Sequence, residues 1–341
     1  MNVLKNNVLA CGFNFPHHSN SSGYHHLVPH ISNKFLNANS YLFGNSKFGS
    51  LMRKINLLIF DLLIPLQYKN YNIIHFIYPE NHIMFSVPKN KISVATVHLP
   101  VDWLEKNHPR KFAANIRYNA FSKLDGIITL SQEQSNTLKE YFPNIMVKFI
   151  PHGINQLVSQ PVMMSDKQNL KIVIIGSNFR DYKSVTDLLN FIQRESKSWE
   201  LHMLGLDKKY HEEFGRYQNV KIYKYLDETE YMNVIANSHV NYLPVTFATA
   251  NNALLESHAL GVPTIATDLD AIRDYSLSTT RHFNSNKELI NHIINIDNMS
   301  IDEYNLIREK TFKEAKKFYW ENIKVEVNSF YDEISNIKGY K

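Results

Sequence analysis

The sequence predicts an α/β protein made of two doubly wound domains in tandem. In the second half, short β-branched runs alternate with helical segments, which is typical of a parallel sheet covered by helices on both faces. The first half shows the same alternation more loosely. The length of 341 residues, with 44% apolar and 20% charged residues, suits two globular domains of ordinary size.

The elements of the second half follow one another closely from residue 170. Strands are predicted at LKIVIIG (170–176), WELHMLG (199–205), NVKIYKYL (219–226), HVNYLPV (239–245) and VPTIATD (262–268). Helices are predicted between them at SVTDLLNFIQRE (184–195), with a serine cap, at DETEYMNVIANS (227–238), with the capping-box pattern, and at NNALLESHALG (251–261). Gly261 is expected to end the last of these helices.

The first half contains five apolar runs that are predicted as strands. They are NNVLACGFNF (6–15), YNIIHFIYP (71–79), KISVATVHLP (91–100), LDGIITLS (124–131) and IMVKFIPHGIN (145–155). We therefore predict a first domain over residues 1–155, a second over 165–317, and a helix over 318–341 that packs back toward the first domain. The polar, patternless stretch at residues 156–169 is read as the linker.

Composition restricts the class of protein. A single cysteine, Cys11, excludes an intramolecular disulfide and a cysteine-based zinc site, and it fits a reducing compartment. The longest apolar run, residues 55–66, is interrupted by Asp61 and Pro65 and is shorter than the roughly 20 residues of a membrane span. With no signal-peptide pattern at the N-terminus, we expect a cytoplasmic protein without a membrane span.

The net charge of +5 is unevenly distributed. Residues 1–150 hold 15 Lys and Arg against 7 Asp and Glu, which is +8, and the remainder is −3. A basic half indicates either an anionic neighbour, such as a phospholipid surface or a phosphorylated substrate, or simply a solvated lysine-rich surface. Nucleic acid is disfavoured, because no dense Lys/Arg run or recognisable binding module is present.

Glu256 is the most informative single residue of the second half. On its predicted helix, the same-face neighbours Ala253 and Leu260 are both apolar, and a carboxylate on such a face is rare without partners. It is therefore either a paired structural residue or an acceptor of hydrogen bonds from a diol such as ribose. The small residues of ATANN (248–252) precede this helix and leave its N-terminal N–H groups available to phosphate oxygens.

The segment NNALLESHALGVPTIATD (251–268) resembles the nucleotide-sugar-binding segment of retaining, family 4 glycosyltransferases (glycosyl transferases group 1). The resemblance implies the GT-B fold, with two Rossmann-like domains facing a central cleft. It also implies that Glu256 holds the ribose hydroxyls and that the backbone at Ala250, Asn251 and Asn252 contacts the sugar and phosphates of the donor. The first of the family's two motif glutamates is replaced by Ala248, so the contact of that glutamate with the donor sugar is not implied.

Other segments are similar to the family in the expected order. IIGSNFRDYKS (174–184) follows a strand where the family places an Arg and a Lys that neutralise the diphosphate, which implies this role for Arg180 and Lys183. Arg180 lies closer to the lysine than is usual. His98 directly follows a predicted strand, and the resemblance places it near the hydroxyls of the donor sugar.

The stretch PHHSNSSGYHHLVPH (16–30) follows the first strand and holds five histidines. By resemblance, Ser22 and Gly23 belong to a loop that approaches the donor phosphates, and His17, His18 and His25 are candidates for the acceptor side. The histidines also allow a zinc site by ligand type. The stretch lacks a carboxylate and an HExxH spacing, so we expect no metal.

Together these features predict a retaining glycosyltransferase that moves a hexose-type sugar from a nucleotide-sugar to a saccharide or lipid-linked acceptor. We expect UDP ahead of GDP as the carrier, no cofactor or metal, a role in bacterial surface polysaccharide or lipopolysaccharide synthesis, and peripheral association with the inner membrane surface. Two alternatives stay open, a sugar-nucleotide epimerase on the same fold and a non-catalytic nucleotide-sugar-binding relative. A histidine-metal hydrolase is a more distant third.

Overall fold

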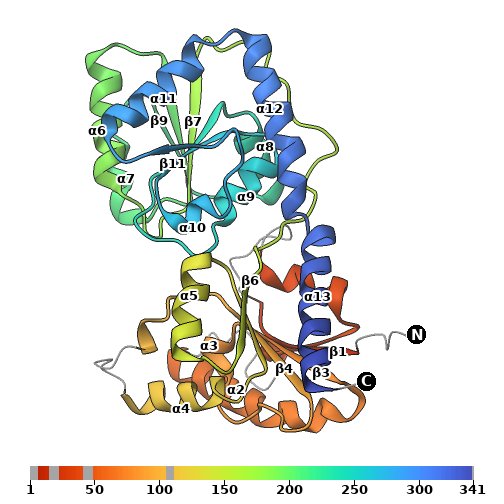
Figure 1. The fold of residues 1–341 in the computed structure, drawn as a ribbon. Helices are drawn as coiled ribbons and strands as arrows, with labels where there is room; N and C mark the ends of the chain where they lie inside the picture. Colours follow the sequence, from red (N-terminus) through yellow and green to blue (C-terminus); the bar gives the residue numbers. More distant parts are fainter. Residues whose placement is uncertain (1–6, 15–22, 41–48, 105–110, 340–341) are drawn as a thin grey trace. The chain divides into compact units, whose positions relative to one another are not determined.

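The computed structural model describes residues 7–14, 23–40, 49–104 and 111–339, and the chain divides into two compact units (Figure 1). Unit 1 comprises residues 1–153 and 320–341, and unit 2 comprises residues 154–319. In its described residues, each unit holds one six-stranded, all-parallel sheet with flanking helices. This is the doubly wound α/β fold that the sequence predicts.

The sheet of unit 1 has the strand order β2-β1-β3-β4-β5-β6. Its strands are β1 (Val8–Gly12), β2 (Lys34–Asn37), β3 (Ile73–Ile77), β4 (Ile92–Val97), β5 (Gly126–Thr129) and β6 (Met146–Phe149). Its α-helices are α1 (Val28–Ile31), α2 (Gly49–Leu63), α3 (Pro79–His82), α4 (Lys111–Phe121), α5 (Gln132–Tyr141) and α13 (Trp320–Lys338). Short 3₁₀ segments are η1 (Tyr24–Leu27), η2 (Ala38–Ser40), η3 (Ile64–Asn70) and η4 (Asp102–Leu104).

The sheet of unit 2 has the strand order β12-β11-β10-β7-β8-β9. Its strands are β7 (Leu170–Ile175), β8 (Trp199–Leu204), β9 (Val220–Tyr223), β10 (Val240–Leu243), β11 (Thr264–Thr267) and β12 (Arg281–Phe283). Its helical segments are α6 (Tyr182–Arg194), η5 (Lys208–Tyr210), α7 (His211–Phe214), α8 (Glu228–Ala236), α9 (Asn252–Ala259), α10 (Asp270–Arg273), α11 (Asn286–Asn298), α12 (Ile301–Ala315) and η6 (Lys316–Phe318).

The side chains of β7 show why unit 2 needs helices on both faces of its sheet. Leu170, Ile172 and Ile174 pack into one apolar cluster, whereas Val173 and Ile175 pack into another. Because successive residues of a strand point to opposite faces, both faces are buried. The continuous β-branched run LKIVIIG is the sequence signature of this arrangement.

One predicted helix start is confirmed and one is wrong. Asp227 and Glu230 form the predicted capping box at α8. At α5, Ser131 is the N-cap and accepts a hydrogen bond from the Gln134 amide. Helix α6, however, begins earlier than its predicted serine cap. Asp181 is its N-cap and accepts the amide hydrogen of Ser184, whose own hydroxyl lies 2.6 Å from that of Tyr242. A side-chain partner inside the unit thus displaces Ser184 from the capping role.

The segment at residues 156–169, which the sequence analysis reads as the linker, is held on unit 2. The Met164 amide donates to Asn305 Oδ1 at 2.9 Å, and the Asn305 side chain donates back to the Met164 carbonyl. Lys167 donates to the carbonyls of Ile296 and Asp297 at the C-terminal end of α11, where its positive charge also interacts favourably with the helix dipole. The segment has no regular element, but it is tied down by these bonds.

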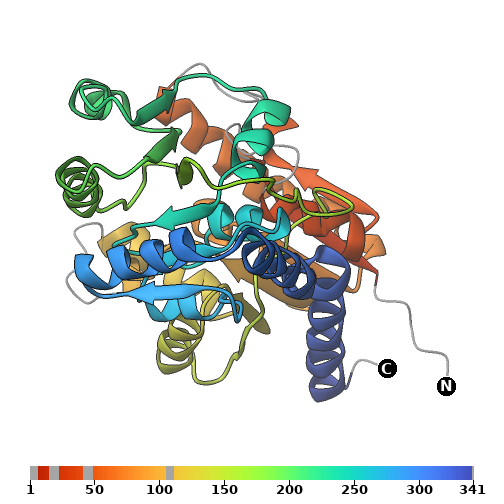
Figure 2. The ribbon, with the colours of Figure 1, turned by 90° about the horizontal axis from the view of Figure 1, so that it is seen from above.

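Helix α13 packs against unit 1, far from the rest of that unit in sequence (dark blue in Figure 1 and Figure 2). Its Tyr331 hydroxyl lies 2.5 Å from Nδ1 of His75 in β3, and Nε2 of the same imidazole lies 2.7 Å from the Thr96 hydroxyl in β4. His75 is fully buried, and burial lowers its pKa to about 3. The imidazole is therefore neutral at physiological pH and joins α13 to two strands.

We expect unit 1 to lose stability on acidification because of His75. Below pH 6.5 His75 is protonated in the unfolded chain, whereas in the folded protein it stays neutral until the pH approaches 3. The stabilisation that the neutral, buried His75 contributes to folding is therefore complete above pH 6.5 and declines as the pH falls. Between pH 6.5 and 5 the free energy of unfolding should fall by about 2 kcal/mol from this residue. Urea titrations of wild type and His75→Gln at both pH values measure it. An unchanged pH slope in the variant contradicts the assignment.

None of the helices in the described part of the chain combines the length and the hydrophobicity that crossing a bilayer requires.

Candidate functional site

The strand order of each sheet indicates where ligands bind. In an open parallel sheet, ligands lie outside the carboxyl ends of the strands, at the point where the strand order reverses. In unit 2 this point lies between β7 and β10, and in unit 1 it lies between β1 and β3. The loops that follow these four strands contain most of the residues that the sequence analysis selected.

In unit 2, the loop after β7 and the loop after β10 are joined by backbone hydrogen bonds. The Asp181 amide donates to the Pro244 carbonyl at 2.8 Å, and the Thr246 amide donates to the Phe179 carbonyl at 2.9 Å. Arg180 and Val245 form an isolated antiparallel bridge between these two bonds. The structure therefore brings Arg180 next to the start of the loop that carries Ala248, Ala250 and Asn251.

The Arg180 guanidinium is held by its own loop. Nε and Nη2 donate to the Ile175 carbonyl, and Nη1 donates to the Asn178 carbonyl at 2.8 Å. Burial lowers the pKa of Arg180 to about 10, so the side chain keeps its charge at neutral pH. A guanidinium has five N–H groups, so one further N–H on each terminal nitrogen can point at an anion. Lys183 lies on the exposed surface of the first turn of α6.

Glu256 is buried in α9, with 3% of its surface exposed. The Tyr231 hydroxyl on α8 donates to Glu256 Oε2 at 2.6 Å. Burial and the neighbouring Glu256 carboxylate raise the pKa of Tyr231 well above its usual value, while the positive charge of Arg180 acts against this shift. Tyr231 thus stays protonated and lies within electrostatic reach of both Arg180 and Glu256. Sequence reasoning missed Tyr231, because nothing in its local pattern separates it from a core tyrosine.

Helix α9 has a well-defined cap at each end, and the one at Gly261 is as the sequence predicts. Asn251 is the N-cap, and its side chain accepts the amide hydrogen of Leu254 at 3.1 Å. At the other end, Gly261 has φ +74°, its amide donates to the His258 carbonyl, and the Val262 amide donates to the Ser257 carbonyl. This pair of hydrogen bonds is the Schellman motif, and glycine adopts its left-handed conformation without strain. The first-turn N–H groups beside Asn252 and the Glu256 carboxylate are thereby fixed on one short helix.

In unit 1, the loop after β1 and the loop after β4 meet through aromatic rings. Tyr24, which follows Gly23 and begins η1, packs edge-on against His98 with ring centroids 4.8 Å apart. The His98 ring also lies 4.0 Å from that of Tyr78, which ends β3 in a left-handed conformation. The rings of His25 and His26 lie 4.2 Å apart, and burial with the neighbouring His26 lowers the pKa of His25 to about 4.

Glu80, a residue that the sequence analysis did not select, holds the His98 loop. Its Oε1 accepts the backbone N–H groups of both His98 and Leu99, the latter at 2.8 Å. Burial raises the pKa of Glu80 to about 7, although these two amides and the charge of Arg117 act in the opposite direction. Its local pattern, a glutamate after a strand and a proline, is too ordinary to indicate this role. The structure therefore adds a buried carboxylate to the histidines and tyrosines at this edge.

Three residues of the histidine loop, His17, His18 and Ser22, lie outside the described residues. Within the residues that the structure describes, no group of three or more His, Cys, Asp or Glu side chains is placed to hold a metal ion. Among the described residues, the candidates thus form one set in unit 1, around His98, and a separate set in unit 2, around Arg180, Tyr231 and Glu256.

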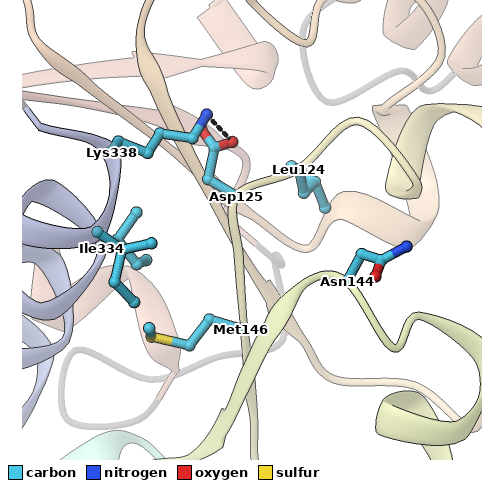
Figure 3. A pocket seen from close by; sticks show the side chains of 7 residues that line it. Leu124, Asp125, Asn144, Met146, Ile334 and Lys338 are labelled. Carbon is cyan, nitrogen blue, oxygen red and sulfur yellow. Dashed lines mark ion pairs between the residues drawn. The ribbon is translucent and has the colours of Figure 1, made fainter.

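A hollow of about 180 Å³ lies elsewhere in unit 1, near the amino ends of β5 and β6 (Figure 3). Its charged lining residues, Asp125 and Lys338, form an ion pair with each other, and Asp125 also accepts the Ser93 amide hydrogen at 2.8 Å. Because these charges are already paired at the amino edge of the sheet, we assign the hollow no part in the site.

Comparison with known proteins gives a family for unit 2 and a fold for the chain. Residues 169–296 match the family model described as glycosyl transferases group 1. A search of curated proteins finds no match. Among solved structures, sucrose-phosphate synthase from Thermosynechococcus elongatus is similar with a TM-score of 0.68 at 16% identity, over 97% of this chain and 89% of that one.

Two further solved structures are similar over most of their length. Anabaena HepE in complex with UDP and glucose has a TM-score of 0.68 at 12% identity, over 95% of this chain and 99% of that one. The catalytic domain of starch synthase IV from Arabidopsis thaliana, bound to ADP and acarbose, has a TM-score of 0.65 at 13% identity, over 86% and 80%. At these identities the likeness concerns the fold.

Proposed function

We propose that the chain, a glycosyltransferase by its match to the group 1 model at residues 169–296 and with the GT-B fold, moves a hexose-type sugar from a nucleotide-sugar donor to an acceptor. In this proposal the configuration at the sugar is retained. The observation that carries the proposal is the set of Arg180, Tyr231 and Glu256 beside the switch point of unit 2. A buried carboxylate suits the ribose diol, and a nearby fixed cation suits the diphosphate.

In this proposal the chemistry of the donor is divided among named residues. Glu256 accepts hydrogen bonds from the ribose hydroxyls, and the first turn of α9 behind Asn251 faces a phosphate. As the bond to the sugar breaks, negative charge grows on the diphosphate, and Arg180 with Lys183 neutralises it without a metal. His98, held by Glu80, lies near the sugar.

The acceptor is proposed to be a saccharide or a lipid-linked saccharide in bacterial surface polysaccharide synthesis, bound by unit 1. The basic first half, with 15 Lys and Arg against 7 Asp and Glu, supports an anionic or membrane-bound acceptor. We place the protein in the cytoplasm, in peripheral contact with the inner face of the membrane.

Thermal stabilisation of the purified protein by UDP, GDP, ADP and dTDP, with EDTA present, tests the donor site. One diphosphate at one hundred times its dissociation constant should add about 2.7 kcal/mol of stability. Stabilisation only after Mg²⁺ replaces EDTA contradicts the metal-free site, and no stabilisation by any nucleotide contradicts the transferase proposal.

The alanine at position 248 favours one alternative, a relative that binds nucleotide-sugar but does not transfer it. Incubation with the matching nucleotide-sugar separates the cases. A transferase releases nucleoside diphosphate, faster when acceptor is added; an epimerase converts the sugar without releasing nucleotide; and a binding protein does neither.

A further inference from the structure

Helix α2 and the η3 segment that continues it expose a line of aliphatic side chains. One side of α2 is buried in unit 1 and carries Leu57 and Phe60. The other side carries Ile55, Leu58 and Leu62, followed by Leu66 in η3, at spacings of three or four residues. Leu62 and Leu66 expose 55% and 73% of their surface. Because α2 is apolar on both sides, one of these sides stays exposed in the part of the chain that the structure describes.

A further exposed apolar residue, Phe85, is held near the end of α2. The carboxylate of Asp61, near the end of α2, accepts the Met84 amide hydrogen at 3.2 Å and the Phe85 amide hydrogen at 2.7 Å. These bonds hold the loop of Phe85 beside the end of α2, and 61% of the Phe85 surface is exposed. We call Ile55, Leu58, Leu62, Leu66 and Phe85 together the α2 patch.

The exposed charges in the stretch of chain that carries the α2 patch have a single sign. Between residues 49 and 91 the acidic residues are Asp61 and Glu80, and both are buried. The basic residues of the same stretch reach the surface: Arg53, Lys54, Lys69, Lys89 and, partly buried, Lys91. An apolar patch surrounded by exposed cations is the combination by which interfacial helices bind anionic lipid.

We propose that the α2 patch is the surface through which unit 1 docks on an anionic lipid bilayer. This inference rests on the proposed function, since a lipid-linked acceptor would be presented at such a surface. A second copy of the chain is a poorer occupant, because a two-fold contact would bring the same cations of both copies together. A bilayer instead supplies anionic headgroups for the cations and acyl chains for the apolar side chains.

Vesicle flotation of the full chain tests the proposal without an activity assay. The probes are vesicles of phosphatidylcholine alone, and of phosphatidylcholine and phosphatidylglycerol in equal parts. Wild type should float with the anionic vesicles, and less so as salt is added. The triple variant Leu62→Gln/Leu66→Gln/Phe85→Gln should bind at least about tenfold more weakly.

A charge variant and matched controls complete the design. Lys54→Gln/Lys69→Gln should lose roughly fivefold in binding per lysine. The controls remove similar groups elsewhere: Val325→Gln, 62% exposed on α13, and Lys208→Gln/Lys287→Gln in unit 2, exposed in the same way. Both controls should float like wild type, and all variants should keep the wild-type melting temperature.

Three results would overturn the proposal. The first is a wild type that floats with neither vesicle, and the second is a patch variant that floats as well as wild type. The third is a wild-type dimer in light scattering that the triple variant converts to monomer, because the patch would then be covered by a second copy. Thermal stabilisation of the same samples by nucleotide distinguishes the docking proposal from the proposed function. Loss of vesicle binding with nucleotide binding intact contradicts only the docking surface, and loss of nucleotide binding with vesicle binding intact contradicts only the donor site.

Discussion

Glu256→Ala should abolish the stabilisation of the protein by its nucleoside diphosphate. The carboxylate is 3% exposed and fixed on α9, and Tyr231 holds one of its oxygens at 2.6 Å. A ligand diol that reaches this site would exchange its hydrogen bonds to water for bonds to a buried charge, which are worth about 1.5–3 kcal/mol each. Loss of two such bonds weakens binding at least about a hundredfold.

Two further variants make the Glu256 result specific. Tyr231→Phe keeps the carboxylate but removes the hydroxyl that orients it, and should weaken nucleotide binding by about tenfold. Glu200→Ala is the matched control, because Glu200 is a carboxylate of the same unit that pairs with Lys221 near the start of β8. Titration calorimetry on the three variants measures the effect. Wild-type affinity in Glu256→Ala would show that the carboxylate has only a structural role.

Arg308→Ala should destabilise unit 2 strongly, most of all around α8. Arg308 on α12 is fully buried, and its guanidinium donates to the carbonyls of Ala236 at 2.7 Å and Ser238 at 2.9 Å. These carbonyls lie at the C-terminal end of α8, where a cation also interacts favourably with the helix dipole. The change to alanine leaves buried acceptors without donors and opens a cavity, and should cost about 4 kcal/mol.

Hydrogen exchange followed by mass spectrometry locates this effect. In Arg308→Ala, protection should fall in α8, α9 and α12, while the sheet of unit 1 keeps its protection. Arg308→Lys should lose less, because an ammonium can still donate to one carbonyl. Lys310→Ala, an exposed cation two residues away, is the control. Equal hydrogen exchange in Arg308→Ala and wild type would contradict the role of Arg308 in holding the end of α8.

Much of the fold could be predicted because its strands are buried on both faces and read as continuous β-branched runs. The two strands that sequence analysis missed, Lys34–Asn37 and Arg281–Phe283, form edges of their sheets. Each is short and begins with a charged residue, so neither has the apolar run that marks a central strand. Edge strands are determined by their partner in space more than by their own composition.

The candidate site residues also differ in how much of their role can be read from the local sequence. Glu256 could be found because a carboxylate on an apolar helix face is unusual. Tyr231 and Glu80 could not, because their roles depend on contacts with residues 25 and 18 positions away. A tyrosine in a helix and a glutamate after a strand look ordinary until the chain has folded.

The position of α13 has a consequence for synthesis. Its Ile323, Val327 and Phe330 are buried in unit 1, yet a ribosome makes this helix only after all of unit 2. Domains generally fold as units, in the order in which they are made. Here unit 2 can complete its fold before unit 1, because the sheet of unit 1 is translated first but its covering helix α13 is translated after unit 2. The apolar face of the first sheet that α13 covers therefore stays exposed on the nascent chain until α13 has been made.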